Sequence, residues 1–282
     1  MIELGDNRYG KSAIRLVKVT RRDEGHQVRD LTVSIALEGD FAAAHTAGDN
    51  GGVVATDTMK NTVYALAPEH LVGAIESFGV VLAQHFLGSD QVSKATVSID
   101  EHRWIRMPTE DGVAPDAFLR SGDFTRTAVV AASRERTTIE AGIRDLTVMK
   151  TARSSFAGFP RDEYTTLAET DDRIMATRIT ATWRYGEHVH AAELDELFDG
   201  VGATLLDVFA NHDSRSVQES IWIMGRAILE QHADIDEVRM ALPNLHHWLV
   251  DLSPFGLPND REIFVATREP FGLIEATVRR EG

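Results

Sequence analysis

The sequence contains no cysteine. Disulfide bonds, iron–sulfur clusters, zinc ribbons and cysteine nucleophiles are therefore excluded, and a reducing, cytoplasmic environment is expected. Glycine and proline number only 21 and 8, too few for a long flexible linker. The apolar run from Leu71 to Leu87 is interrupted by Glu76, Gln84 and His85, which argues against a membrane span. We therefore expect a globular protein of the cytoplasm without a membrane partner.

Basic residues are also scarce. Lysine and arginine total 29 against 44 aspartate and glutamate residues, which gives a formal net charge of −15. Such a surface repels a phosphate backbone, and the sequence has no basic stripe with interleaved aromatic residues, so no nucleic-acid partner is expected. An anionic small substrate would need a cation in its binding site to offset the repulsion from this net negative charge.

Several catalytic signatures are missing as well. The sequence has no phosphate-binding P-loop, no His-Glu-x-x-His and no Gly-x-Ser-x-Gly. The segment Gly200–Gly202 lies within an apolar helical pattern, where core packing is its better interpretation. His188 and His190 are the best metal candidates, but their position at a turn favours a solvated pair over a ligand pair. No metal and no cofactor is expected.

Apolar periodicity predicts strands, then helices, then strands in the first half of the chain. The predicted strands are Lys11–Arg22, Arg29–Leu37, Val92–Met107 and Phe124–Ser133. Helices are predicted from Asp57 and, with a stronger amphipathic pattern, from Pro68. The segments Glu38–Gly52 and Pro108–Gly122 are interpreted as loops.

The second half repeats this order. Its predicted strands are Thr138–Thr151, Met175–Tyr185, Glu237–Val250 and Glu262–Arg279. One apolar helical face runs from Leu194 to Val208, and another contains Ile221, Met224 and Ile228. The two halves share little literal sequence, so the repeat is one of pattern alone.

This order predicts an α+β fold of antiparallel sheets with helices on one face, in two tandem domains that cover residues 1–136 and 137–282. A doubly wound parallel fold, which alternates single strands with single helices, is disfavoured. Open sheet edges can be managed by oligomers that close such sheets into a barrel.

Four stretches are polar where the pattern predicts buried or junction positions. They are Tyr9–Ser12; Val54–Asn61; Ser155–Leu167 with Asp172–Ile174; and Ser216–Glu219 with Leu242–His247. Thr56 and Asp57 begin a predicted helix, where free N–H groups favour an anion. Ser216 and Glu219 have the spacing of a capping box at a second helix start. Two such ends could hold a flat anionic heterocycle, although both could simply be helix caps.

Three side chains in these stretches suit such a heterocycle. Arg173 offers a planar fork that matches adjacent oxygen and nitrogen acceptors. Gln218 offers the complement of a cyclic amide edge, and Phe156 can stack on a purine face. Taken alone, each of these residues would more often be structural.

Together the four stretches resemble urate oxidase (uricase), a cofactor-free family built from two tandem tunnelling-fold domains. The resemblance extends from Tyr9-Gly10-Lys11 to Pro270–Ala276. Its most specific part is Asp162-Glu163-Tyr164-Thr165-Thr166-Leu167 followed by Asp172-Arg173-Ile174. The sequence is thus similar to that family over nearly its whole length.

The resemblance implies the role of each site residue. Lys11 would draw a proton through the hydroxyl of Thr56, with His246 as the orienting partner. The urate pocket would consist of Thr56, Asp57, Phe156, Leu167, Arg173, Val217, Gln218 and Asn244. His246 and His247 are adjacent on a predicted strand, so they should point to opposite faces and only one can serve. The family pattern selects His246.

The implied reaction is the oxidation of urate by dioxygen and water to 5-hydroxyisourate and hydrogen peroxide, without a cofactor. A cytoplasmic, bacterial homotetramer is implied, with active sites at subunit interfaces. Two alternatives remain: a tunnelling-fold enzyme acting on a pterin or related purine, and a non-catalytic purine-binding protein. Gln218 in place of an anchoring acid disfavours the first alternative. The presence of Lys11, Thr56 and His246 disfavours the second.

Overall fold

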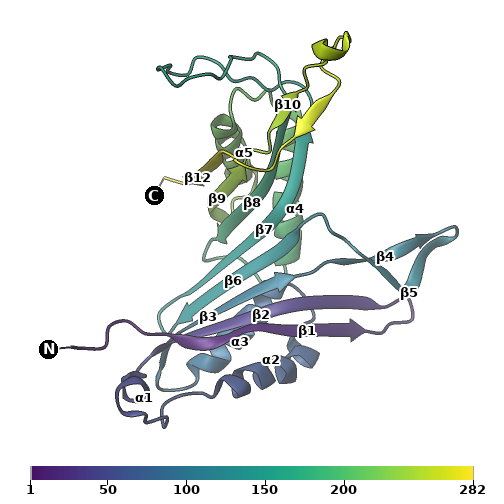
Figure 1. Ribbon diagram of the computed structural model, residues 1–282. Coiled ribbons are helices and arrows are strands. Elements are labelled where there is room, and N and C mark those ends of the chain that lie inside the picture. Colours follow the sequence, from purple (N-terminus) through teal and green to yellow (C-terminus); the bar gives the residue numbers. More distant parts are fainter. Residues whose placement is uncertain (1, 282) are drawn as a thin grey trace. The chain divides into compact units, whose positions relative to one another are not determined.

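The computed structural model describes residues 2–281, which form two compact units (Figure 1). The first unit is the chain up to Gly142 together with Arg184–Phe198. The second is Ile143–Trp183 together with the chain from Asp199 onward. Strand β7 (Thr137–Lys150) begins in the first unit and ends in the second. A domain boundary between residues 136 and 137, just ahead of this strand, stays a prediction.

The first unit is built on four antiparallel strands in the order β1-β2-β3-β6. They are β1 (Tyr9–Thr20), β2 (Gln27–Gly39), β3 (Val92–Glu101) and β6 (Thr125–Ser133). Alternate residues of β2, among them Leu31, Val33 and Ile35, are buried because they face the core. The strands predicted over Lys11–Arg22 and Arg29–Leu37 are confirmed as β1 and β2, which pair antiparallel.

Helices cover one face of this sheet, as Figure 1 shows. They are α2 (Thr56–His70) and α3 (Ile75–Leu87), and a short α1 (Ala42–Ala47) precedes them. Helix α3 contacts β3 and β6 through its fully buried Phe78 and Leu82, whereas α2 contacts β1. The apolar stripe read from the sequence is therefore the packed face of α3.

The helix start expected at Pro68 is wrong. Pro68 lies within the last turn of α2, and the break between the helices comes after Leu71, the C-cap residue. The Lys18 ammonium from β1 donates to the carbonyls of Ala67 (3.1 Å), Pro68 (2.9 Å) and Leu71 (2.8 Å). These bonds satisfy backbone carbonyls that have no partner within the helix. Helix α2 therefore continues past Pro68, and the Lys18 ammonium caps its C-terminal end.

Two segments interpreted as loops contain regular structure. Residues 108–122 include most of a hairpin between β4 (Trp104–Thr109) and β5 (Gly112–Arg120), and the first segment holds α1. The expected strand Val92–Met107 is correspondingly divided between β3 and β4. Strand β5 is largely exposed, so its sequence lacks the apolar alternation that marks a half-buried strand.

The second unit has the strand order β7-β8-β9-β12. Its further strands are β8 (Met175–Tyr185), β9 (Ile235–Pro243) and β12 (Leu273–Arg279). Its helices are α4 (Leu194–Asn211), whose first turn belongs to the first unit, and α5 (Val217–Gln231). Helix α5 packs on β9 and β12. A separate two-stranded sheet pairs β10 (His247–Leu249) with β11 (Phe264–Ala266), and the short 3-10 helix η1 (Ser253–Phe255) lies between them in sequence.

The strand expected over Glu237–Val250 is interrupted. Strand β9 ends at Pro243, and the strand pattern resumes only at His247. Between them the backbone N–H of Asn244 donates to the carbonyl of Gly272, and that of Leu245 donates to Ala176. This irregular segment carries two of the expected site residues. The strand expected over Glu262–Arg279 likewise splits into β11 and β12.

Each unit therefore combines antiparallel strands with helices on one face, and the α+β prediction is confirmed. No helix between residues 2 and 281 is long and apolar enough to cross a membrane.

Candidate functional site

Lys11 lies beside an irregularity of β1. The pairing of β1 with β2 shifts between Lys11 and Ile14, and Ala13 has a φ of +57°. Such bulges redirect side chains and often adjoin active sites. Gly10, next to Lys11, has no room for a side chain, because a Cβ there would lie 1.8 Å from the carbonyl oxygen of Ile35. The half-buried Lys11 thus projects from a tightly fixed part of the strand.

Thr56 and Asp57 begin α2, as expected. The N-cap residue, Ala55, has no side chain that could accept from the first N–H groups, so these donors are not capped in the way that Ser or Asp would cap them. The Asp57 carboxylate instead accepts from Lys60 (2.5 Å) and Asn61 (2.9 Å). This helix end therefore keeps its capacity for an anion.

The charges around Asp57 support this interpretation. The hydrogen bond and the charge of Lys60 hold the pKa of Asp57 below its ordinary value, and the charge of Lys11 lowers it further. Since Lys60 neutralises the carboxylate, the acidic side chain does not cancel the positive end of the helix. Lys11, Thr56 and Asp57 all belong to the first unit.

The second unit contains a cavity of about 810 Å³. Five of the expected site residues line it: Phe156, Leu167, Arg173, Asn244 and His246. Further residues along its wall are Thr170, Asp172, His247, Trp248, Leu249, Arg261, Glu262 and Phe264. All of them belong to the second unit, so this unit by itself forms a pocket for a small molecule.

Arg173 and Phe156 form the core of this pocket. The Arg173 guanidinium carbon lies 5.2 Å from the centroid of the Phe156 ring, and its Nε is buried without a hydrogen-bond partner. Burial lowers the pKa of Arg173 from its ordinary value, although the group stays cationic. A buried donor without an acceptor is costly. The guanidinium is therefore ready to bind an acceptor that enters the cavity.

The backbone fixes both residues. Phe156 and Thr170 form an antiparallel bridge, in which the N–H of Phe156 donates to Thr170 (2.8 Å) and the N–H of Thr170 donates back (3.1 Å). The N–H of Arg173 donates to the carbonyl of Ser154 (2.7 Å). On its own segment, Phe156 also stacks on Phe159, with ring centroids 5.0 Å apart and planes at 15°.

His246 and His247 both line the cavity, so the expectation that they point to opposite faces is wrong. The expectation assumed a continuous strand, whereas the chain is irregular up to His247. His246 stacks on Trp248, with ring centroids 5.1 Å apart, and His247 Nδ1 lies 3.0 Å from the carbonyl oxygen of Leu245. Burial, and then the charge of Arg173, lowers the pKa of His246, which favours the neutral ring.

Val217 and Gln218 do not line this cavity. They begin α5 as expected, and the side chain of Ser216 accepts the N–H of Glu219 (3.1 Å). The Glu219 carboxylate turns to the N–H of Arg215 (2.8 Å), not to Ser216, so only half of the expected capping box forms. Val217 is buried, and Gln218 is exposed.

The start of α5 is nevertheless joined to the pocket. The N–H of Ser155, next to Phe156, donates to the carbonyl of Ser214 (2.8 Å). Ser154 and Ser214 also form a parallel bridge. The backbone that carries Phe156 is thus tied to the turn that precedes α5.

Trp248 and Arg261 are pocket residues that sequence reasoning missed. The spacing of Trp248 two residues after His246 was the one available signal, because alternate residues of an extended chain share a side. No sequence pattern indicated that Arg261 lines the pocket, because it lies in a loop, where side-chain directions follow no regular period.

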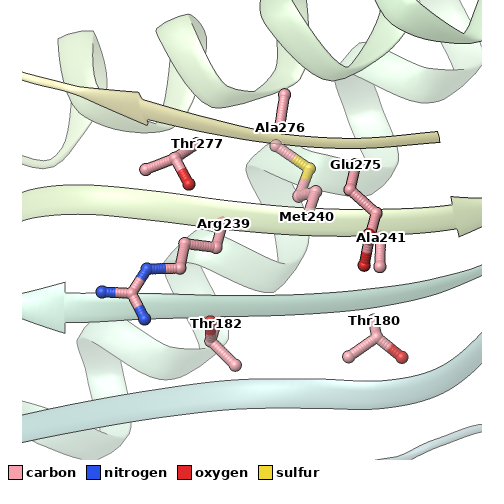
Figure 2. Close-up of a pocket in the computed structure, with 8 residues that line it drawn as sticks. All are labelled: Thr180, Thr182, Arg239, Met240, Ala241, Glu275, Ala276 and Thr277. Carbon is pink, nitrogen blue, oxygen red and sulfur yellow. The ribbon is translucent and has the colours of Figure 1, made fainter.

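A second hollow, of about 370 Å³, lies on the sheet of the second unit. Figure 2 shows Arg239, Thr182 and Thr277 on adjacent strands there. Arg239 pairs in register with Thr277 and contacts the carboxylate of Glu237 at 2.6 Å. This hollow is an open polar sheet surface, and its arginine already has a carboxylate partner. His188 and His190 are exposed beyond the end of β8.

Comparison with known proteins agrees with these observations. A family model described as uricase matches residues 7–131 and 139–275. The uricase of Arthrobacter globiformis is 48% identical over 282 residues, which cover 100% of this chain and 91% of that protein. The uricase of Aspergillus flavus is 38% identical over 288 residues and covers 97% of this chain and 95% of that protein.

Solved structures agree as well. The crystal structure of the Arthrobacter globiformis uricase matches with a TM-score of 0.94 over 100% of this chain and 96% of that chain. That of a uricase from Bacillus fastidious, 25% identical, matches with a TM-score of 0.81 over 97% and 93%. The antiparallel sheets with helices on one face are thus the tunnelling fold of the solved uricases. The chain belongs to the uricase family.

Proposed function

We propose that this chain is a urate oxidase, which converts urate, dioxygen and water into 5-hydroxyisourate and hydrogen peroxide. The observation that carries the proposal is the half-buried Arg173 beside Phe156 in the cavity of the second unit, because its buried Nε has no hydrogen-bond partner. A planar fork suits adjacent oxygen and nitrogen acceptors of a purine anion, and the aromatic ring offers a stacking surface. Arg173 also supplies the local cation that an anionic substrate needs on a chain of charge −15.

Asn244 and His246 complete the pocket wall. Asn244 has both a donor and an acceptor with which to position dioxygen or water above the ring. The lowered pKa of His246 favours a neutral imidazole that can accept a proton or a hydrogen bond. Lys11 and Thr56 are the proposed base and relay, with His246 as their orienting partner.

The proposed chemistry balances without a further reactant. Deprotonated urate gives two electrons to dioxygen, which leaves as hydrogen peroxide after taking up two protons. Water supplies the hydroxyl oxygen of the product. The protons that the reduced dioxygen takes up pass through the relay of Lys11 and Thr56. Deprotonation makes urate electron-rich enough to reduce dioxygen directly, so the proposal includes no cofactor. The contribution of the protein is orientation, proton transfer and exclusion of bulk water.

We also propose that the working form is a homotetramer, in which tunnelling-fold sheets of several copies close into a barrel. In that assembly Lys11, Thr56 and Asp57 of one copy would face Phe156, Arg173 and Gln218 of its partner. The support is that the cavity is lined only by residues of the second unit, whereas the proposed base and relay belong to the first. A cytoplasmic location belongs to the same proposal.

Oxygen uptake by chelator-treated protein tests the proposed activity. Urate absorbance and dissolved oxygen should fall in equal molar amounts, and one peroxide should appear for each urate consumed. Urate binding without oxygen uptake would indicate a carrier. No binding would contradict the proposal and favour a pterin or a related purine as ligand.

A mixing experiment tests the shared site. Lys11→Met and Arg173→Gln chains, whose activity alone should be at most about a hundredth of the wild-type value, should regain part of the activity when they are co-expressed, because mixed tetramers would contain some intact sites. Absence of any recovery in mixed tetramers would contradict a site shared between copies.

A further inference from the structure

Arg261 makes a two-point contact with Asp172, the residue directly before Arg173. Its Nη2 donates to the backbone carbonyl of Asp172, and its Nη1 lies 3.6 Å from the Asp172 carboxylate oxygen Oδ2. The two residues are 89 positions apart in the sequence. This contact therefore joins the loop before β11 to the turn that carries the proposed urate-binding arginine.

The side chain of Asn259 forms hydrogen bonds on both sides of the loop that carries Arg261. The Asn259 amide donates to the carbonyls of Val250 and Ile263, each at 2.8 Å, and its oxygen accepts the N–H groups of Glu262 (3.0 Å) and Ile263 (3.1 Å). Arg261 itself has a φ of +65°, a conformation that costs energy for a residue with a Cβ. The hydrogen bonds of Asn259 thus stabilise the backbone conformation from which the Arg261 side chain contacts Asp172.

The turn at Asp172 is connected by hydrogen bonds and by the chain itself to the proposed binding residues Phe156 and Arg173. The Asp172 carbonyl that accepts from Arg261 also accepts from the hydroxyl of Thr170 (2.8 Å). Thr170 forms the backbone bridge to Phe156, and Arg173 follows directly. Arg261 therefore fixes the turn that lies between Thr170, the backbone partner of Phe156, and Arg173.

The charges give Arg261 a second effect. Neighbouring Arg and Asp side chains can approach each other, as Arg144 and Asp145 do at 3.9 Å. Asp172 directly precedes Arg173 in the chain, so its carboxylate is the acidic group that could turn to that guanidinium if Arg261 did not engage it. Its Oδ1 is buried without a hydrogen-bond partner, and its other oxygen faces Arg261. The Asp172 carboxylate is thus engaged by Arg261, and no ion pair between Asp172 and Arg173 forms among the described residues.

We propose that Arg261 is a positioning residue that sets the affinity of the pocket for urate. It acts through Asp172, by fixing the turn before Arg173 and by keeping the Asp172 carboxylate from neutralising that arginine. This inference rests on the proposed function for its ligand, but the predicted rearrangement of Asp172 does not depend on urate.

Kinetic and binding measurements on Arg261→Gln test the effect on affinity. The KM for urate, and the Kd for urate measured without oxygen, should each rise about tenfold, the equivalent of one charge-assisted hydrogen bond. The kcat should stay within about twofold, because the reacting groups are unchanged. Arg261→Lys, which keeps the charge and one donor, should recover most of the affinity. Arg268→Gln removes an exposed arginine outside the cavity lining and is the matched control.

Asp172→Asn separates positioning from simple attraction between Arg261 and an anion. If the Asp172 carboxylate competes for Arg173 once Arg261 is gone, Asp172→Asn should restore affinity at least threefold in the Arg261→Gln background. An Arg261→Gln/Asp172→Asn protein that binds urate as weakly as Arg261→Gln would overturn the proposal.

A crystal structure of urate-free Arg261→Gln gives a readout that needs no activity. We expect the Asp172 carboxylate to move onto the guanidinium of Arg173, within salt-bridge distance. An unmoved carboxylate and an unmoved Arg173 would overturn the inference even if the wild-type chain oxidises urate. Conversely, a wild-type chain that fails to bind or oxidise urate, with the rearrangement present, would contradict only the proposed function.

Discussion

The guanidinium carbon of Arg173 lies 5.2 Å from the centre of the Phe156 ring, and the two residues are held by separate backbone hydrogen bonds. The N–H of Arg173 donates to Ser154, whereas Phe156 pairs with Thr170. The backbone of each residue is thus fixed by hydrogen bonds within the protein. Such preorganisation reduces the entropy lost when a flat anion binds.

Arg173→Gln should abolish detectable binding of urate in the absence of oxygen. The substitution removes the half-buried cation that lies beside Phe156, and the glutamine amide cannot supply a charged fork. Calorimetric titration with urate measures the effect, and Arg239→Gln, on the second hollow of the same unit, is the control. Retained affinity in Arg173→Gln would refute the assignment of the pocket.

Lys11→Met should lower kcat by roughly 10²–10⁴ while urate still binds. Methionine keeps much of the length and apolar surface of the half-buried lysine but has no proton-accepting group. Steady-state kinetics and oxygen-free binding of urate measure the two effects separately. Lys94→Met is the control in the same unit, since Lys94 pairs with Glu38 and takes no part in the proposed site. Unchanged turnover would remove Lys11 from the mechanism.

Arg173→Gln should also raise the pKa of His246. Burial lowers this pKa first, and the charge of Arg173 lowers it further, so removing the charge leaves only the effect of burial. The ring of the variant should therefore begin to protonate at a higher pH than in the wild-type chain, but still below its ordinary value. NMR titration of labelled histidine, assigned with His246→Gln, follows this change. An unaltered or lowered pKa would show that Arg173 does not act on this ring.

Arg126→Met should destabilise the first unit by about 3–5 kcal/mol, because it leaves a buried carboxylate without its cation. Arg126 contacts Glu76 at 2.8 Å and Asp195 at 2.7 Å, and Glu76 is fully buried. Burial raises the pKa of Glu76, and the charge of Arg126 opposes that rise. Chemical denaturation measures the free energy of unfolding.

The double substitution Glu76→Met with Arg126→Met should recover most of that stability, since it buries no charge. Arg136→Met, which removes an exposed pair with Glu187 at 3.8 Å, should cost less than about 1 kcal/mol. A loss in Arg126→Met no larger than that of Arg136→Met would contradict the account of the buried pair.

Sequence periodicity predicted those strands and helices whose apolar residues face a core. Strand β8 was predicted with its observed bounds, Met175–Tyr185, because buried and half-buried residues alternate along it. Strand β5 was missed because its mostly exposed residues carry no such pattern, and Pro108 and Gly112 resemble loop residues. The local signal thus failed where burial gives no periodicity.

The pocket was predictable only in part, for a related reason. Phe156, Arg173, Asn244 and His246 were identified from the sequence, and the structure brings them to one cavity. The side of His247 was predicted wrongly because a regular strand was assumed across a segment that Pro243 ends. Arg261 could not be predicted, since its place depends on a loop conformation set by the side chain of Asn259.

We propose the cavity around Arg173 as the place where this chain oxidises urate. Simultaneous recording of dissolved oxygen and urate absorbance, on metal-free wild-type and Arg173→Gln proteins side by side, tests it most directly. The wild-type protein should consume urate and oxygen in equal molar amounts, and the variant should consume neither. Equal turnover by both proteins, or none by the wild-type protein, would contradict it.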